Sequence, residues 1–181
     1  MENKKLLVLS DSHGDITALK AVLNWTKNYI PPNDTICAAA FLGDGLSDLK
    51  KAADVTGFYS DWKCVSGNND YGSNIQDALA FDYAEHRFFI CHGHRYSLYG
   101  GHHALLAAAR INNADIALFG HSHVPHYKTT DGIKLINPGS IGRPRSRIGA
   151  TFAVIECPEG RQINVEFYGI GDGHKIEKLN V

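Results

Sequence analysis

The chain lacks long apolar runs and lacks an excess of charge of either sign. Its 181 residues include 18 Lys and Arg against 19 Asp and Glu, so the formal net charge is -1. This near balance argues against stable binding to nucleic acid or to an anionic membrane, because both need a strongly basic surface. The apolar run at residues 6–9 is far too short for a signal-peptide core or a membrane span. We therefore expect a soluble, cytoplasmic protein.

Cysteine is also scarce. Cys37, Cys64, Cys91 and Cys157 are widely separated and form no C-x-x-C pair, which argues against a zinc finger or a disulfide framework. Most of them lie in apolar runs, where a buried and reduced thiol is expected. Apolar residues make up 44% of the chain, enough for a packed core. The length fits one domain spanning residues 1–181.

Histidine, by contrast, is plentiful: five of the ten histidines fall inside five short polar blocks, and a sixth, His126, follows three residues after the last block. The blocks are Asp-Ser-His at 11–13, Gly-Asp at 43–44, Gly-Asn-Asn-Asp at 67–70, His-Gly-His at 92–94 and Gly-His-Ser-His at 120–123. Taken singly, each has a structural explanation as a helix cap, a turn or a loop. Their joint occurrence favours a metal site.

The first half of the chain alternates strands and helices. The apolar run at 5–10 predicts a buried strand that ends before Asp11. Asp15 is placed to cap a helix that ends at the prolines 31–32. Further strands at 35–42 and 62–66 flank a helix at 46–55. This alternating order predicts a parallel sheet with right-handed crossovers.

The second half changes character towards hairpins. The turns Glu85-His86 and Asp131-Gly132 each separate two strand-like runs, and the second is a strong hairpin signal. The predicted elements here are a helix at 103–112 and strands at 81–83, 87–91, 114–119, 127–130, 133–136, 150–156 and 162–168. We expect a single α/β domain in which two mixed sheets pack face to face with helices outside.

Each polar block begins where a predicted strand ends. The carboxyl ends of the strands are where ligands bind in open α/β sheets, because loops from several strands converge there. An extended backbone would also point Asp11 and His13 the same way, and likewise His121 and His123. We therefore expect two divalent metal ions, with ligands drawn from Asp11, His13, Asp44, Asn68, His92, His121 and His123.

The seven candidate ligands divide between two ions. Asp11, His13 and His123 are assigned to one ion, whereas Asn68, His92 and His121 are assigned to the other. Asp44 bridges both with its two oxygens. Two cations with two carboxylates and neutral imidazoles leave about +2 for a hydroxide and an anionic substrate. Because four imidazoles must be neutral to bind, metal loss is expected below about pH 6.5.

The series D-x-H, G-D, G-N-x-D, H-G-H and G-H-x-H resembles the calcineurin-like metallophosphoesterase superfamily. The compact length and the segment 137–140 (Asn-Pro-Gly-Ser) resemble its small bacterial and archaeal phosphodiesterase branch. The similarity runs from about residue 6 to residue 140. It implies a four-layer α/β/β/α fold with a central sandwich of two mixed sheets. It also implies a dinuclear site, for which we expect manganese, with zinc, iron or nickel as alternatives.

The resemblance implies hydrolysis of a small phosphate ester by a hydroxide that bridges two metal ions, with diesters preferred over monoesters. An alternative is a non-catalytic interaction scaffold similar to the retromer subunit that shares this fold. Such a scaffold needs no complete ligand set, whereas all seven ligand positions are filled here. The exposed β edge expected near the C-terminus is compatible with a homo-oligomer, a dimer or a tetramer.

Several further residues have two interpretations each. Arg143 and Arg145 suit bidentate contact with a substrate phosphate, or equally a solvated loop or a subunit contact. Asp70 is expected to order its own loop rather than bind metal. Asn137 is expected to fix a histidine or the backbone of a loop near the site.

The chain departs from the superfamily at Asn69. Many members carry histidine there, which is thought to protonate the leaving group, and an amide has no useful pKa for that role. His94 is the substitute acid, or equally a partner that orients His92.

Without a histidine at position 69, alkyl esters should be hydrolysed slowly and aryl or other low-pKa leaving groups faster, because general acid catalysis is worth about 10²–10⁴-fold. A leaving-group series measured at constant pH tests this expectation. Fast alkyl and slow p-nitrophenyl hydrolysis would contradict it. If His94 is the acid, His94→Ala should lose rate only with the poor leaving groups.

Overall fold

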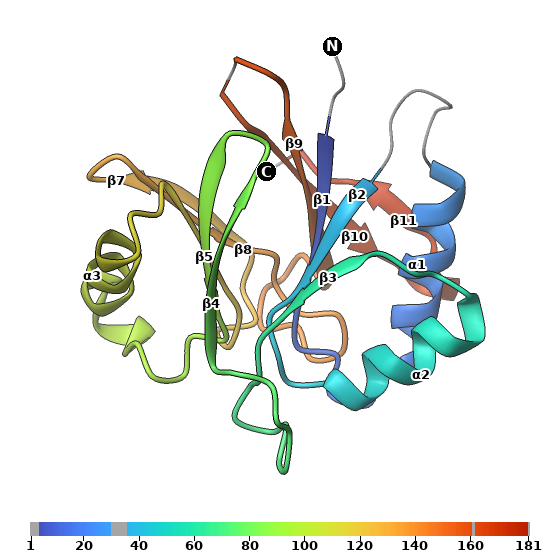
Figure 1. The fold of residues 1–181 in the computed structure, drawn as a ribbon. Coiled ribbons are helices and arrows are strands. Elements are labelled where there is room, and N and C mark those ends of the chain that lie inside the picture. The colour runs from blue at the N-terminus through green and yellow to red at the C-terminus, as the bar shows by residue number, and fades with distance from the viewer. Residues whose placement is uncertain (1–3, 30–35, 161, 181) are drawn as a thin grey trace.

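A computed structural model describes residues 4–29, 36–160 and 162–180, and it contains two β-sheets with helices on their outer faces (Figure 1). The first sheet has the order β11-β10-β9-β1-β2-β3. Its strands are β1 (Lys4–Leu9), β2 (Ile36–Phe41), β3 (Asp61–Cys64), β9 (Ala150–Cys157), β10 (Asn164–Ile170) and β11 (Ile176–Lys178).

The second sheet has the order β4-β5-β6-β8-β7. Its strands are β4 (Ala78–Tyr83), β5 (His86–Cys91), β6 (Ile116–Phe119), β7 (His126–Thr130) and β8 (Ile133–Asn137). The helices are α1 (Ile16–Tyr29), α2 (Leu46–Thr56) and α3 (His103–Ile111). Both sheets are mixed, because β1, β2 and β3 are parallel in one and β5, β6 and β8 in the other, with antiparallel strands beside them.

Alternation along the strands separates the core into three layers of side chains. On β1, Leu6 and Val8 pack between the two sheets, whereas Leu7 and Leu9 pack under α1 and α2. Successive side chains of a strand point to opposite faces, so one apolar strand serves both layers. A third cluster lies between the second sheet and α3. The predicted four-layer α/β/β/α fold is confirmed.

The local signals for α1 and for the second hairpin are confirmed. Asp15 accepts a hydrogen bond from the Ala18 backbone N–H (2.9 Å), as a helix-capping side chain does. The prolines predicted to end this helix lie outside the described residues. Asp131 and Gly132 both have positive φ, as a tight turn between β7 and β8 requires.

Two details differ from the sequence prediction. The β4–β5 turn is formed by Ala84 and Glu85 rather than by Glu85 and His86. His86 begins β5 instead, where its Nδ1 lies 2.5 Å from an Asp115 carboxylate oxygen. The short edge strand β11 was not predicted, because three residues, two of them charged, carry no readable alternation.

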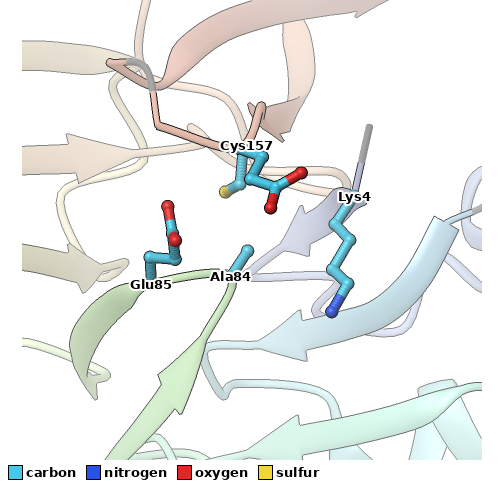
Figure 2. A pocket seen from close by; sticks show the side chains of 5 residues that line it. Lys4, Ala84, Glu85 and Cys157 are labelled. Atoms are coloured by element: carbon cyan, nitrogen blue, oxygen red, sulfur yellow. The ribbon is translucent and has the colours of Figure 1, made fainter. Parts of the chain in front are cut away.

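A cavity of about 300 Å³ lies at the end of the sandwich where β1 begins and β4 turns into β5 (Figure 2). Lys4, Ala84, Glu85, Cys157 and Glu159 line it. Burial raises the pKa of the Cys157 thiol to about 12, so this cysteine is not a nucleophile near neutral pH. All five polar blocks follow the opposite ends of their strands. No helix within the described ranges has the length and apolar character to cross a membrane.

Leu118→Ala should lower the free energy of unfolding by about 2–5 kcal/mol, because Leu118 is fully buried between the sheets and its truncation leaves a cavity. Ile111→Ala is the matched control: its side chain is 82% exposed at the end of α3, and the change should stay within about 0.5 kcal/mol. Urea denaturation measures both. Equal effects would contradict the assigned core.

Candidate metal centre

The loops that follow the parallel strands run side by side because backbone hydrogen bonds continue beyond the strand ends. Asp11 N–H donates to the Gly43 carbonyl (3.0 Å), and His13 N–H donates to the Asp44 carbonyl (3.1 Å). In the second sheet, Gly120 N–H donates to the His92 carbonyl (2.9 Å). The polar blocks are therefore held together by the same register that pairs the strands.

A first group of potential metal ligands joins Asp11, His13 and His123. Asp11 Oδ1 lies 3.1 Å from His123 Nε2 and 3.6 Å from His13 Nε2. The two imidazole Nε2 atoms are 3.2 Å apart. Asp11 is fully buried and His123 nearly so, so this group lies at the floor of the site.

A second group joins Asp11, Asp44 and His92, so that Asp11 belongs to both. His92 Nε2 lies 3.4 Å from Asp44 Oδ2 and 3.9 Å from Asp11 Oδ1. His13 Nε2 is 3.6 Å from the same Asp44 oxygen. The two carboxylates therefore lie among imidazoles that come from both sheets.

Backbone carbonyls orient two of these imidazoles. His92 Nδ1 is 2.7 Å from the Leu42 carbonyl oxygen, and His123 Nδ1 is 2.6 Å from the Arg143 carbonyl oxygen. A carbonyl only accepts, so Nδ1 carries the proton and the neutral ring presents the Nε2 lone pair to the carboxylates. Fixing a ring through its other nitrogen in this way is typical of metal-binding histidines.

The arrangement fits a cation. Asp11 Oδ1 and His92 Nε2 are buried and have no hydrogen-bond partner among the described residues. Unsatisfied buried polar atoms cost about 1–3 kcal/mol each, and more when charged, so a carboxylate oxygen facing imidazole lone pairs calls for a positive charge between them. Carboxylate and imidazole donors suit divalent transition metals.

In the metal-free protein, a proton supplies part of that positive charge. Burial lowers the pKa of His92, but its pairing with Asp44 and the charge of Asp11 outweigh burial, so the pKa is raised. Burial raises the pKa of Asp44, but His92 and Asn69 outweigh it and hold the pKa at about 2. The pKa of Asp11 is also held well below its usual range against burial, by His123 and His13.

The structure brings five of the seven predicted ligands into the two groups and leaves His121 and Asn68 beside them. The His121 ring centroid is 5.1 Å from that of His92, and the His121 backbone N–H donates to Asp11 Oδ2 (3.1 Å). Asn68 is exposed. Its neighbour Asn69 instead donates to both Asp44 oxygens, through its backbone N–H (2.7 Å) and its side-chain amide (2.6 Å).

The prediction that an extended backbone aims the ligand pairs was wrong. Five of the candidate ligands have φ between 44° and 65°, in the left-handed region: Asp11, His13, Asp44, His121 and His123. Such residues are uncommon outside glycine, although Asp and His tolerate the conformation better than most. Tight left-handed turns, rather than continued strands, direct these side chains, and such strain is typical of functional sites.

Two acidic residues hold the loops in place. Asp70 accepts four backbone N–H groups at 2.7–2.9 Å, from Asp44, Gly45, Leu46 and Gly67. The prediction that it orders its own loop is confirmed, and it also fixes the start of α2. Asp48 accepts from Ser12 Oγ and Gly14 N–H, both at 2.8 Å. Sequence analysis missed Asp48, whose one signal is its place in the first turn of a helix.

The segment 137–140 anchors the other loops. The Asn137 amide donates to the Gly120 carbonyl (2.8 Å) and to Ser122 Oγ (3.0 Å), which confirms its predicted role in fixing loop backbone. Ser140 Oγ donates to the Asp11 carbonyl (2.8 Å). Gly120 has no room for a side chain, because a Cβ there would lie 2.1 Å from Ser10 Oγ.

Two adjacent grooves lie beside the ligand groups, and the first is lined by two of their residues, His13 and Asp44. The catalytic groove, of about 290 Å³, is lined by His13, Gly14, Asp44, Gly45, Ser47, Asp48, Asn69, Asp70 and Arg143. The outer groove, of about 740 Å³, is lined by Leu46, Ser47, Lys50, Asn69, Asp70, Tyr71, Gly72, Ser73 and Asn74. The grooves share the lining residues Ser47, Asn69 and Asp70, so they lie next to each other.

His94 lies beside the second ligand group. Its ring centroid is 5.5 Å from that of His92 and 6.2 Å from that of His121. Burial, followed by the charges of His92 and Arg95, lowers the pKa of His94. Its Nδ1 is buried without a hydrogen-bond partner among the described residues.

Comparison with known proteins agrees with this geometry. A sequence profile of the calcineurin-like phosphoesterase superfamily domain matches residues 5–160. The chain belongs to that superfamily. A probable metallophosphoesterase of Mycoplasma pneumoniae is 36% identical over 169 residues, which cover 91% of this chain and 96% of that protein. The superfamily implies divalent metal ions. This relative and a probable metallophosphoesterase of Bacillus subtilis support a phosphoester hydrolase.

Solved structures show the same calcineurin-like fold. A predicted phosphoesterase of Streptococcus pneumoniae matches with a TM-score of 0.76 at 25% identity and covers 99% of both chains. Wild-type Vps29 of Entamoeba histolytica, crystallised with zinc, matches with a TM-score of 0.73 at 21% identity, over 97% of this chain and 98% of that one. At this identity the second likeness concerns the fold alone.

Metal binding should weaken as the pH falls from 8 to 6, with an onset above the value expected for free histidine. The raised pKa of His92 means that the metal-free fold is stabilised by the His92 proton below about pH 6.5 and loses that contribution as the pH rises. A metal ion must displace this proton. The rise in melting temperature caused by Mn²⁺ should therefore be larger at pH 8 than at pH 6.

Two variants control the pH experiment. His92→Gln removes both the ligand and the competing proton, and it should abolish most of the metal-induced shift. His174→Gln changes an exposed histidine in the β10–β11 connection and should leave the shift unchanged. A metal-induced shift that does not depend on pH in the unaltered protein would show that His92 does not exchange a proton for metal.

Proposed function

We propose that the protein is a metal-dependent phosphodiesterase with a dinuclear centre. The observation that carries the proposal is the buried pair of unpartnered acceptors, Asp11 Oδ1 and His92 Nε2, within 3.9 Å of each other. Without a cation between them, only a proton on His92 can offset part of the cost of leaving these atoms unsatisfied. All seven ligand positions of the sequence pattern are filled, which favours the enzyme over a non-catalytic scaffold.

The proposed ligands are the seven of the sequence pattern, five of which lie in the two groups. One ion takes Asp11, His13 and His123, and the other takes Asn68, His92 and His121, with Asp44 shared. Asn68 comes from the sequence pattern alone, and its loop is fixed beside Asp44 through Asp70. Manganese is the proposed metal, since mixed oxygen and imidazole donors suit it as well as zinc, iron or nickel.

The metal ions would supply a bridging hydroxide as nucleophile and neutralise charge on the phosphate. The protein contributes the remaining interactions. Arg143 lines the catalytic groove, where its guanidinium suits a non-bridging phosphate oxygen. The Asn69 amide holds Asp44 and has no proton to give. His94, beside His92 and His121, is the proposed proton donor to a leaving oxygen.

The adjacency of the two grooves supports diesters over monoesters. The reacting phosphate occupies the catalytic groove beside Arg143, and the outer groove provides space for a second ester substituent beyond Asn69. A monoester would use the first groove alone. With a hydroxide bound, the metal-loaded centre would carry about +1, which matches the single charge of a diester better than the double charge of a monoester.

The proposal also includes a cellular location and an oligomeric state. A cytoplasmic location follows from the sequence features rather than from the fold. The edge strand β11 is the surface proposed for a homodimer or tetramer, because an unpaired strand edge presents free backbone groups. Sedimentation of a monomer alone at micromolar concentration would refute the assembly.

Metal-loaded protein should hydrolyse bis-p-nitrophenyl phosphate faster than p-nitrophenyl phosphate, with Mn²⁺ the best of the metals added after chelation. Asp44→Asn should lower kcat/KM by more than about 100-fold, because even changes beyond the direct ligands cost 10–100-fold. Asp54→Asn, an exposed position on α2, is the matched control and should be unchanged. Absence of hydrolysis with every metal would favour the scaffold.

A further inference from the structure

The outer groove has a lining that indicates what lies beyond the reacting phosphate. We propose that it binds a nucleoside monophosphate leaving group, so that the substrate is a nucleoside diphosphate derivative cleaved at its phosphoanhydride bond. This inference rests on the proposed function and names the substrate class for it. Three features of the lining carry it: an aromatic ring, a cation and the lack of a proton donor.

Tyr71 supplies the ring. Its side chain is 88% exposed, yet it lies on backbone that is fixed next to the metal centre. Asp70 N–H donates to the Gly67 carbonyl (3.3 Å) and Ser73 N–H donates to the Asp70 carbonyl (3.2 Å), while the Asp70 side chain accepts four further N–H groups. A ring presented on ordered backbone suits stacking on a nucleobase, worth about 1–3 kcal/mol per base.

Lys50 supplies the cation. It is exposed on α2 and forms no ion pair within the described part of the chain. The acidic residue of the same helix turn, Asp48, faces Ser12 and Gly14 instead. The Asp70 carboxylate, the acidic group of the lining, is occupied by its four N–H donors. The groove therefore offers positive charge to an anion.

Among the described residues that line the outer groove, none is suited to protonate a leaving oxygen near neutral pH, and His94, the proposed proton donor, lines neither groove. Asn69, at the junction of the two grooves, is an amide whose N–H groups bind Asp44. A leaving group seated here must depart as a stable anion, and an alkoxide is too basic for that. A phosphate monoester is a far weaker base, and Lys50 can neutralise the charge that develops on it.

The proposed step balances with water alone. The water oxygen forms a bond to the phosphorus that carries the non-nucleoside substituent, and the bond from that phosphorus to the anhydride oxygen breaks. The electron pair leaves with the nucleoside monophosphate into the outer groove. The two protons of the water are shared between the two phosphate products and the solvent. An outer groove of about 740 Å³ is within the range of pockets that hold molecules of nucleotide size.

Three matched probes test the proposal with Mn²⁺-loaded protein. The β-methyl ester of ADP (P1-adenosine P2-methyl diphosphate) contains the anhydride and the nucleoside, P1,P2-dimethyl diphosphate lacks the nucleoside, and adenosine 5′-methylphosphate lacks the anhydride. The first should be cleaved with a kcat/KM at least about 10-fold above the second, as 1.4 kcal/mol of stacking gives. The third should be slower still. Equal rates for all three would overturn the proposal.

Variants locate the effect in the groove. Tyr71→Ala should lower kcat/KM for the ADP ester about 10-fold and leave dimethyl diphosphate unchanged, and Tyr71→Phe should restore the loss. Lys50→Gln should slow both anhydrides. Tyr59→Ala and Lys51→Gln, at exposed positions outside the groove, are the matched controls. A Tyr71→Ala variant with unchanged kinetics on the ADP ester would refute the subsite.

Two further readouts separate this inference from the proposed function. Hydrolysis in ¹⁸O water should place the label in methyl phosphate and not in AMP, whereas label in AMP would refute the orientation. Calorimetry should show AMP binding that weakens with Tyr71→Ala. If bis-p-nitrophenyl phosphate is hydrolysed but the ADP ester has no advantage, the inference fails alone. If no ester or anhydride is hydrolysed, the proposed function fails with it.

Discussion

The Asp11 carboxylate is the interaction on which the site depends, because its two oxygens serve different purposes. Oδ2 accepts hydrogen bonds from Ser10 Oγ (2.5 Å) and from the His121 backbone N–H (3.1 Å), which ties the loop after β1 to the loop after β6. Oδ1 is left unpartnered and faces the imidazoles of His123 and His92. One buried charge thus joins the two sheets and also creates the demand for a cation.

The surrounding structure prevents the loops from rearranging to give Asp11 Oδ1 a hydrogen-bond partner from the protein. Left-handed backbone at the ligand positions costs about 1–3 kcal/mol per residue, and it persists only where neighbouring contacts enforce it. Asp70, Asp48 and Asn137 provide those contacts through backbone N–H and carbonyl groups of the loops. The apolar clusters on both sides of each sheet supply the stability that offsets this strain.

The layers and the convergence of the polar blocks could be predicted because both depend on regular repeats. Apolar strands with turns or helices between them predict two packed sheets, and the strand ends predict where the polar side chains meet. The direction in which each ligand side chain points depends on the backbone angle φ at that residue. Beyond the end of a strand, the alternation of apolar and polar residues does not predict this angle. For the same reason Asp48 and the Arg143 carbonyl, which binds His123, were not predicted: both act through contacts between distant loops.

The two carboxylates come from loops of the first sheet, whereas His92, His121 and His123 follow strands of the second. The thickness of the apolar layer between the sheets therefore acts as a spacer that sets how far the imidazoles stand from the acids. A larger side chain at Ala153, which is buried in this layer, would push these halves apart. Selection for metal affinity thus extends to the volume of residues that never touch an ion.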